Sequence, residues 1–230
     1  MAPRWNGAPK RLFDLVFSTV LLVVLSPALA VCALAVRWID GPPVLFSQER
    51  LGRGGSRFRI YKFRSMSEAP GAALTAAGDP RVTPLGHHLR HTKADELPQL
   101  WNVLQGHMSL VGPRPELPEY AARLPHAFRA IADLRPGLTD WASLALRDEA
   151  EILAMRSDDP AYYERAVLPR KLAFARLYHR RMSLWIDLRL LVATAFLGIG
   201  LVRLSYDLAD ATLLDRGRRD LIPDRERSDA

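Results

Sequence analysis

The chain has 230 residues, of which 49% are hydrophobic and 25% charged, and its formal net charge is +7. This length suits one ordinary domain with a real core. The excess of positive charge favours an anionic partner: nucleic acid, membrane headgroups or a phosphorylated substrate. Cys32 is the single cysteine, which excludes an intrachain disulfide and a thiolate metal cluster and fits a protein that faces the cytosol.

An apolar segment near the start is long enough to cross a membrane. Residues 15 to 36 give 22 residues without a charge, and a helix of that length rises roughly 33 Å. Ser26-Pro27 lies in the middle, where proline kinks a helix, and the Ser26 hydroxyl can satisfy a carbonyl freed there. Both flanks are cationic, so positive charge gives neither end a preference for crossing. We therefore predict a re-entrant helix, broken at Ser26-Pro27, that enters and leaves by the same face.

The same segment has three alternative interpretations. A straight membrane span is the main one. A cleaved signal peptide would end near Ala28-Leu29-Ala30, but the apolar stretch continues past these residues and secreted-type cysteines are lacking. A buried helix of a soluble domain is disfavoured by the length of the segment.

Residues 48 to 66 predict a β-hairpin with one apolar and one cationic face. Phe58, Ile60 and Phe63 interleave with basic residues, and residues 53 to 56 (RGGS) supply the turn. An anionic membrane surface would favour the basic patch of this segment, although each member also fits a solvated strand face. The patch consists of Arg50, Arg53, Arg57, Arg59, Lys62 and Arg64. No stacking motif supports nucleic-acid binding.

The next stretch combines a loop with a short helix. Small residues predict a mobile loop at 67 to 80, and Thr83-Pro84 predicts the start of a helix. His87 and His91 have the i, i+4 spacing of a metal pair. Because no Glu-containing zinc motif accompanies them, we interpret them as surface histidines.

Residues 92 to 115, TKADELPQLWNVLQGHMSLVGPRP, contain the strongest candidate site. Asp95 and Glu96 suit a magnesium-bound phosphate, because one carboxylate can attack phosphorus while the other holds the metal. Asp95, or alternatively Thr92, is the predicted N-cap of the next helix, where backbone N–H groups stabilise anions. Arg114 lies in a stiff proline-flanked loop and suits phosphate oxygens. The alternative is an exposed acidic pair favoured by a helix dipole.

The second half predicts further helices. An apolar stripe that includes Leu100 and Trp101 predicts core, and a Pro-Gly turn at 136 to 137 precedes helices that reach Asp187. Between Arg189 and Arg203 lie 13 uncharged residues, too few to cross a bilayer, so a core or interfacial helix is expected, with Trp185 at the headgroups.

The predicted fold class is α+β and mainly helical. We expect residues 1–40 to form the re-entrant membrane helix and residues 41–206 to form a membrane-surface catalytic domain that contains the small hairpin. We expect residues 207–230 to form a charged, flexible tail.

Several ordered blocks resemble bacterial sugar transferases of the monotopic phosphoglycosyl transferase type. They lie between about Lys10 and Ala195 and read KRLFDL, Ser26-Pro27, IYKFRSM, ADELPQLWNVLQGHMSLVGPRP and RPGLTDWA. The resemblance implies transfer of a sugar 1-phosphate from a UDP-sugar to a polyprenyl (undecaprenyl) phosphate, with release of UMP, which initiates glycan biosynthesis. It implies a bacterial inner (cytoplasmic) membrane location, with the catalytic domain on the cytoplasmic face.

The resemblance also implies roles for individual residues. Asp95 would form a covalent phosphosugar intermediate, and Glu96 together with Asp95 would bind Mg²⁺. Phosphate or substrate binding, the helix break and headgroup contacts would fall to Arg90, Arg114 and Arg147, to Ser26 and Pro27, and to Lys10 and Arg11, respectively. The chain departs from the family pattern at Asp140, where many members have glycine, and at Ala145-Leu146, which replace a polar pair.

Expected partners are the UDP-sugar donor, the polyprenyl phosphate acceptor and membrane lipids, without nucleic acid; a homodimer is a further candidate. The alternative function is a non-catalytic membrane-surface adaptor that uses the basic hairpin to bind lipids or partners. A phosphatase with an aspartyl nucleophile ranks last, because it gives no reason for the apolar helix.

Overall fold

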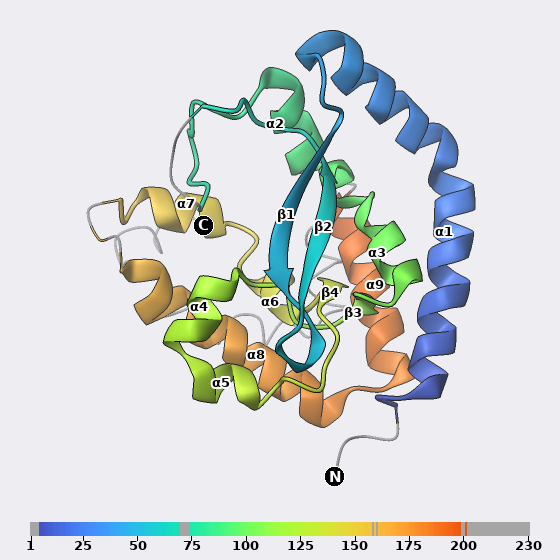
Figure 1. Cartoon of the computed structure of the whole chain (residues 1–230), viewed down its shortest axis with the longest axis vertical. Coiled ribbons are helices and arrows are strands. Elements are labelled where there is room, and N and C mark those ends of the chain that lie inside the picture. Colours follow the sequence, from blue (N-terminus) through green and yellow to red (C-terminus); the bar gives the residue numbers. More distant parts are fainter. Residues whose placement is uncertain (1–4, 70–73, 158, 160, 199–200, 202–230) are drawn as a thin grey trace.

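The structure, a computed structural model, describes residues 5–69, 74–157, 159, 161–198 and 201. The fold is mainly helical and includes two small β-ladders (Figure 1). The helices are α1 (Ala8–Ala35), α2 (Pro84–His91), α3 (Gln99–Gln105), α4 (Pro118–Arg123), α5 (Pro125–Arg129), α6 (Trp141–Ala145), α7 (Glu149–Ala154), α8 (Leu168–Arg181) and α9 (Leu184–Gly198). The strands are β1 (Leu45–Leu51), β2 (Arg57–Phe63), β3 (Ser109–Val111) and β4 (Gly137–Thr139). The predicted tail at 207–230 lies outside the described residues, as does part of the predicted loop at 67–80.

The apolar helix α1 continues through Ser26-Pro27. Proline cannot donate to the carbonyl of Val23, four residues earlier, and the Ser26 hydroxyl donates to that carbonyl instead, at 2.8 Å. The predicted role of Ser26 is therefore confirmed, and the helix continues past this step to Ala35. The re-entrant path of the helix stays a prediction. A π-helical turn then extends it from Val36 to Asp40. By length and composition alone, the helix from Ala8 to Asp40 is able to cross a membrane.

The first turns of α1 are held by the body of the protein. Lys10, only 6% exposed, lies with its Nζ 2.5 Å from Asp187 Oδ2 at the start of α9. Trp5 Nε1 also donates to Asp187, at 2.9 Å. Arg11 donates to the carbonyls of Val103 and Leu104 near the end of α3. The expectation that Lys10 faces lipid headgroups is therefore corrected, because its side chain is buried against Asp187. The headgroup contact of Arg11, which is half-buried, stays a prediction.

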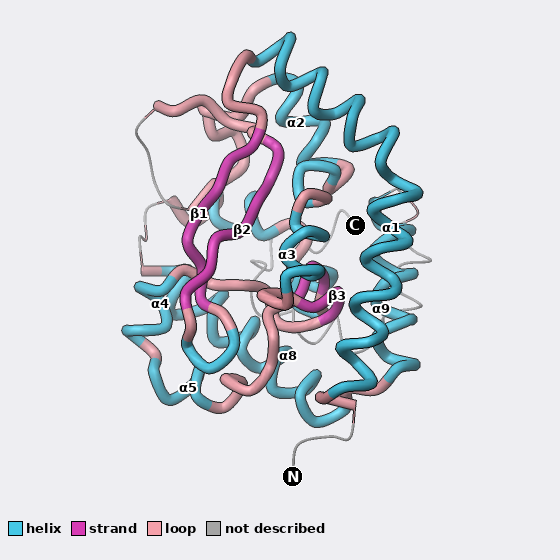
Figure 2. The backbone as a smooth tube through the Cα atoms, turned by 45° about the vertical axis from the view of Figure 1, so that its right-hand side comes forward, coloured by secondary structure: helices cyan, strands magenta, loops and turns pink. Residues whose placement is uncertain are grey.

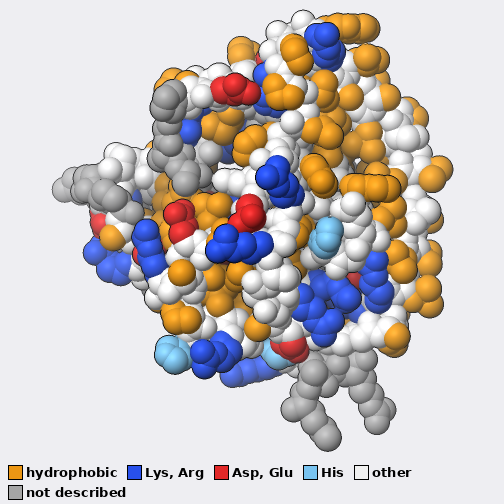
Figure 3. Space-filling model, in the orientation of Figure 1, with side chains coloured by type: hydrophobic (Ala, Val, Ile, Leu, Met, Phe, Trp, Pro, Cys, Tyr) orange, Lys and Arg blue, Asp and Glu red, His pale blue; other side chains and the backbone are white. Residues whose placement is uncertain are grey.

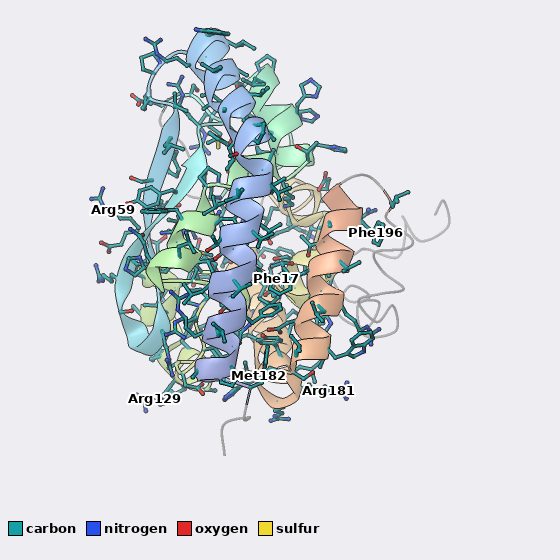
Figure 4. The ribbon with its side chains drawn as sticks, turned by 90° about the vertical axis from the view of Figure 1, so that its right-hand side faces the viewer. Phe17, Arg59, Arg129, Arg181, Met182 and Phe196 are labelled. Carbon is teal, nitrogen blue, oxygen red and sulfur yellow. The ribbon has the colours of Figure 1, made fainter. Side chains whose placement is uncertain are left out.

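The other end of the helix contacts the same body. Thr83 Oγ1 donates to Asp40 Oδ2 at 2.8 Å, and Arg64 donates to the main-chain carbonyls of residues 40 to 42. Figure 2 shows α1 along one side of the molecule, and Figure 4, in which α1 faces the viewer, shows α3 and the hairpin to one side of it and α9 to the other. Both ends of the apolar helix are thus attached to one folded unit.

The predicted hairpin is confirmed. β1 and β2 pair antiparallel, from Leu45 opposite Phe63 to Leu51 opposite Arg57. Phe58 and Ile60 are buried and Arg59 is exposed at the outer edge of the hairpin (Figure 4). The two faces are nevertheless not purely apolar and purely cationic. Residues two apart share a face, so Lys62 lies on the side of Phe58 and Ile60, while Phe63 lies on the other.

Two glycines bring the segments around the Arg114 loop together. β3 and β4 form a parallel pair in which Ser109 faces Gly137 and Val111 faces Thr139. A Cβ atom on Gly137 would lie 2.1 Å from the nitrogen of Gly112, so a side chain here would force the segments apart. The chain leaves this contact directly into Pro113 and Arg114, which directs the loop toward the acidic pair.

The core consists of two clusters. The larger one joins β2, α3, β3, α6, α8 and one face of α9, including Leu190 and Ala193. This burial makes α9 a core helix, which is one of the two alternatives predicted for this segment. The smaller cluster is formed by Val36, Phe63 and Leu89. Trp101 was predicted in the core but is 53% exposed. Leu100 and Val103 lie on the buried face of α3, whereas Trp101 lies on another face of this helix, which lines a groove beside α1.

Candidate active site

Asp95 and Glu96 lie in a single 3₁₀ turn, Ala94–Glu96, between α2 and α3. The preceding residue, Lys93, has φ of 59° and reverses the chain after α2. Both predicted caps are wrong: Thr92 ends α2, and α3 begins only after Pro98, with no side-chain cap among the described residues. Pro98 explains the delay, since proline is tolerated only at the start of a helix.

Glu96 is the centre of an ion-pair group. It is 7% exposed, and Arg114 contacts both of its oxygens, at 2.5 Å from Nη2 to Oε1 and 3.3 Å from Nη1 to Oε2. Lys62 Nζ lies 3.6 Å from Oε1. Burial by itself would raise the pKa of Glu96, but Arg114 and Lys62 outweigh burial and hold this pKa well below its ordinary value. Glu96 is therefore an ionised anchor at neutral pH.

Asp95 has a different environment from its neighbour. Its side chain is buried, with 4% of the residue exposed, and Oδ1 accepts no hydrogen bond from the described residues. Burial and the adjacent charge of Glu96 raise the pKa of Asp95 to about 6. A buried carboxylate oxygen without a partner is costly, and such a group is frequent at functional sites.

Asp95 opens onto a cationic cleft of about 580 Å³. Arg50, Lys62, Arg64 and Arg90 also line it. Figure 3 shows Lys and Arg side chains gathered together with acidic ones near the middle of this face, whereas the α1 edge is largely hydrophobic. The cleft can therefore neutralise a phosphorylated ligand close to an unpaired carboxylate.

The basic patch predicted on the hairpin is divided by the structure. Lys62 faces Glu96, and Arg50 is held by Gln48 and lies close enough to Arg114 and Glu116 for their charges to act on it. Arg57, by contrast, pairs with Glu49 at the surface. The patch is thus not one membrane-facing surface, because alternation along the strands sends its members to opposite sides.

Sequence reasoning missed Lys62 as a site residue, although a signal was present. Phe58, Ile60 and Lys62 follow one another at the period of two that defines a strand face, so a cation was due on the buried side. A buried cation requires an anion, and Glu96 is that anion.

A second cleft, of about 720 Å³, adjoins the first. Arg90 and Thr75 line both clefts, and Arg147 lies in the second, beside Lys93 and the exposed His87. Arg147 Nε lies 3.0 Å from Asp148 Oδ1. The structure therefore brings Arg90 together with Asp95, and Arg114 together with Glu96, while Arg147 belongs to the neighbouring cleft.

The acidic pair fits a magnesium ion that a substrate helps to bind. Mg²⁺ is often held by one or two carboxylates plus phosphate oxygens, and Asp95 offers an oxygen without a protein partner. Among the described residues, no group of three or more His, Cys, Asp or Glu side chains is placed to hold a metal. The remaining ligands would therefore have to come from phosphate and water.

Asp140 links the Arg114 loop to α6. Its Oδ1 accepts a hydrogen bond from the nitrogen of Ser143 at 2.7 Å, which caps α6, and its Oδ2 accepts one from the nitrogen of Arg114 at 3.3 Å. Burial raises the pKa of Asp140. A glycine at this position would provide neither bond.

Comparison with known proteins gives consistent results. The family model described as bacterial sugar transferase matches residues 5–200. An undecaprenyl-phosphate glucose phosphotransferase of Komagataeibacter xylinus is 39% identical over 83% of this chain, and a UDP-glucose:undecaprenyl-phosphate glucose-1-phosphate transferase of Escherichia coli is 35% identical over 84%. The chain spans only 36% and 40% of those two proteins. The corresponding transferase of Caulobacter vibrioides is 38% identical over 80% of this chain, which spans 67% of it.

Proposed function

Because the chain belongs to the bacterial sugar transferase family, we propose that it transfers a sugar 1-phosphate from a UDP-sugar to a polyprenyl phosphate and releases UMP. The relatives' names supply the two substrate classes. The observation that carries the proposal is Asp95, a buried carboxyl group that lines a cationic cleft and has one oxygen without a hydrogen-bond partner among the described residues. A non-catalytic adaptor would gain nothing from such a costly group.

The proposed reaction has two displacements at one phosphorus. A carboxylate oxygen of Asp95 attacks the phosphorus that carries the sugar, and the bond to UMP breaks, which leaves an aspartyl phosphosugar on the protein. A phosphate oxygen of the acceptor then attacks the same phosphorus. The bond to Asp95 breaks, the carboxylate is regenerated and a polyprenyl diphosphate sugar leaves. Donor and acceptor need never occupy the site together.

Cationic side chains make the first attack feasible. A carboxylate approaching a diphosphate is repelled unless charge is neutralised, and preorganised charge is usually the largest catalytic contribution. Arg90 and Lys62 line the cleft of Asp95 and are placed for this role. Arg114 is proposed to bind a phosphate group, and its ion pair with Glu96 fixes the orientation of its guanidinium group. Arg147, in the adjoining cleft, is proposed to meet the nucleotide end.

Asp95 and Glu96 are the proposed magnesium ligands. Bound there, Mg²⁺ would supply further neutralisation of the diphosphate. Glu96 remains ionised through its contacts with Arg114 and Lys62, and the raised pKa of Asp95 makes its ionisation sensitive to that added charge.

We also propose that the protein lies on the cytoplasmic face of the bacterial inner membrane and that α1 is re-entrant. The outer face of α1 is strongly apolar, with Val20, Val23 and Val31 all more than half exposed. Its two ends contact one folded unit, through Asp187 and through Thr83 and Arg64. A helix that crossed the bilayer would carry one end away from a domain confined to one side, so these contacts support a return to the same face.

The deciding experiment omits the acceptor. Purified protein incubated with UDP-sugars labelled in the sugar is expected to retain label covalently and to release one UMP for each label bound. Asp95→Asn is expected to do neither. Protein that binds liposomes but neither retains label nor releases UMP, across many donors, would favour the adaptor instead.

A further inference from the structure

An apolar groove lies beside the cationic cleft. It has a volume of about 630 Å³ and is walled by α1, the hairpin and the start of α3. Leu29, Ala30 and Ala33 line it from α1, Tyr61 and Phe63 from β2, and Trp101 from α3. This volume is in the range of sites that hold small organic ligands, about 300–1,000 Å³. The side chain of Trp101, which is 53% exposed, forms part of the wall of this groove. This role explains why it lies at the surface.

The groove and the cleft are continuous around β2. Leu45 and Phe63 line both of them. Lys62 faces the cleft, whereas Tyr61, on the opposite face of the strand, lines the groove. The turn that follows α2 spans the same boundary, since Asp95 lines the cleft and Pro98, three residues later, lines the groove. One ligand can therefore reach a strongly cationic site and an almost wholly apolar one at the same time.

We propose that this groove binds the first isoprene units of the polyprenyl phosphate acceptor, whose phosphate enters the cleft of Asp95. The proposal rests on the proposed function and adds a site to it. The acceptor combines an anionic phosphate with a long run of apolar isoprene units, and the adjoining sites offer this polarity in the same order. The acceptor is favoured over other lipids as the occupant. The proposed reaction requires the acceptor's phosphate to approach Asp95, and the groove begins next to Asp95.

Acceptor chain length provides the test. The full chain in lipid nanodiscs is assayed with undecaprenyl phosphate and with a one-isoprene phosphate, which leaves most of the groove empty, and the ratio of the two kcat/KM values is compared between variants. Ala30→Trp places an indole in the groove. Ala28→Trp makes the same change on the exposed side of α1, at a position outside the groove, and serves as the matched control.

The long-to-short ratio is expected to fall about tenfold in Ala30→Trp, as burial of a few fewer methylene groups would produce, and to stay at the wild-type value in Ala28→Trp. Trp101→Ala, which removes a wall from an exposed position, is expected to lower the ratio as well. An unchanged ratio in both Ala30→Trp and Trp101→Ala, or an equal fall in Ala28→Trp, would overturn the proposal. So would a change of oligomeric mass in Ala30→Trp at an unchanged ratio, which would assign the groove to a second copy.

The failure of this proposal can be separated from the failure of the proposed function. If wild-type protein releases no UMP from any donor, the transferase assignment itself is wrong. If it transfers sugar phosphate normally and only the chain-length ratio ignores the groove variants, the groove assignment alone is wrong.

Discussion

At the scale of single residues, the site depends on two adjacent carboxylates with opposite environments. Arg114 and Lys62 stabilise the charge of Glu96, while Asp95 lies buried with one oxygen unpaired. The pKa values diverge accordingly, and such divergence between neighbouring acids is a common sign of divided catalytic roles. The pair therefore makes separate predictions for its two members.

Asp95→Asn is expected to abolish turnover and to stabilise the folded protein. A carboxyl whose pKa is raised on folding, here to about 6, destabilises the fold at pH values above that point, by up to about 3 kcal/mol at neutral pH. Asparagine removes this charge. Multiple-turnover assays test the loss of activity, and the unfolding midpoints of wild type and variant in the same detergent test the change in stability. Retention of most of the activity would show that Asp95 is not the nucleophile.

The rate of the donor half-reaction should depend on the ionisation of Asp95. Because the attacking form is the carboxylate and burial raises its pKa to about 6, single-turnover UMP release is expected to be maximal above this pH and to fall tenfold for each further unit below it. An exposed aspartate would give the same decline near pH 4. At low Mg²⁺ a rate that is level down to pH 5 would contradict the assignment, whereas saturating Mg²⁺, proposed to bind Asp95, is expected to move the decline to lower pH.

Glu96→Gln is expected to lose the magnesium response as well as rate. The substitution removes a proposed metal ligand and leaves Arg114 and Lys62 without their anion, so a loss of at least about 100-fold is expected. A magnesium titration of UMP release measures both effects. Glu49→Gln on the exposed part of β1 is the control and should titrate like wild type. An unaltered titration in Glu96→Gln would remove Glu96 from the metal site.

At the scale of elements, α1 is fastened by a buried charge rather than only by apolar contact. Asp187 on α9 accepts hydrogen bonds from Lys10, Trp5 and Tyr178, all at 2.9 Å or less. Lys10 also lies 3.7 Å from Asp14. Breaking a buried pair leaves an uncompensated charge, which is far more costly than losing an exposed pair.

Asp187→Ala is therefore expected to destabilise the protein by about 3–5 kcal/mol. Glu49→Ala, which breaks the exposed pair with Arg57, should cost less than about 1 kcal/mol. Denaturant unfolding in a fixed detergent compares the two variants. A small effect of Asp187→Ala would show that apolar packing alone holds α1.

At the scale of the whole molecule, the apolar helix and the acidic pair are one arrangement. Val36 at the end of α1, Phe63 of β2 and Leu89 of α2 share a small core, against which Ala94, next to Asp95, also packs. Helix α1 thus helps to position the candidate nucleophile. This arrangement would hold Asp95 close to the bilayer surface, where the phosphate of the proposed acceptor lies.

The topology of α1 gives a prediction at this scale. With Cys32 replaced, single cysteines introduced near Trp5 and near Val44 are expected to react with a membrane-impermeant reagent from the same side of inverted membrane vesicles. Both positions flank a helix whose two ends contact one domain. Labelling from opposite sides would identify a straight span and would contradict the re-entrant arrangement.

Local patterns in the chain were sufficient for features that depend on neighbouring residues. Alternation and an RGGS turn predicted the hairpin, Thr83 capped α2 through the nitrogen of Gly86 as its residue type indicates, and Ser26 satisfied the carbonyl that proline released. The ordered blocks were also enough to assign the family, because a motif records which residues are present without requiring their distances.

Only the tertiary structure decided which charges meet. Lys10 and Asp187 are separated by 177 positions, and no periodicity in the chain relates them. The same holds for the ion pair between Arg114 and Glu96 and for the burial of Asp95, which lies in a 3₁₀ turn rather than at the predicted helix start. Sequence by itself determined the elements and the acidic pair. Folding decided the partners, because burial leaves a charge stable only where an opposite charge from a distant segment is brought within a few ångströms.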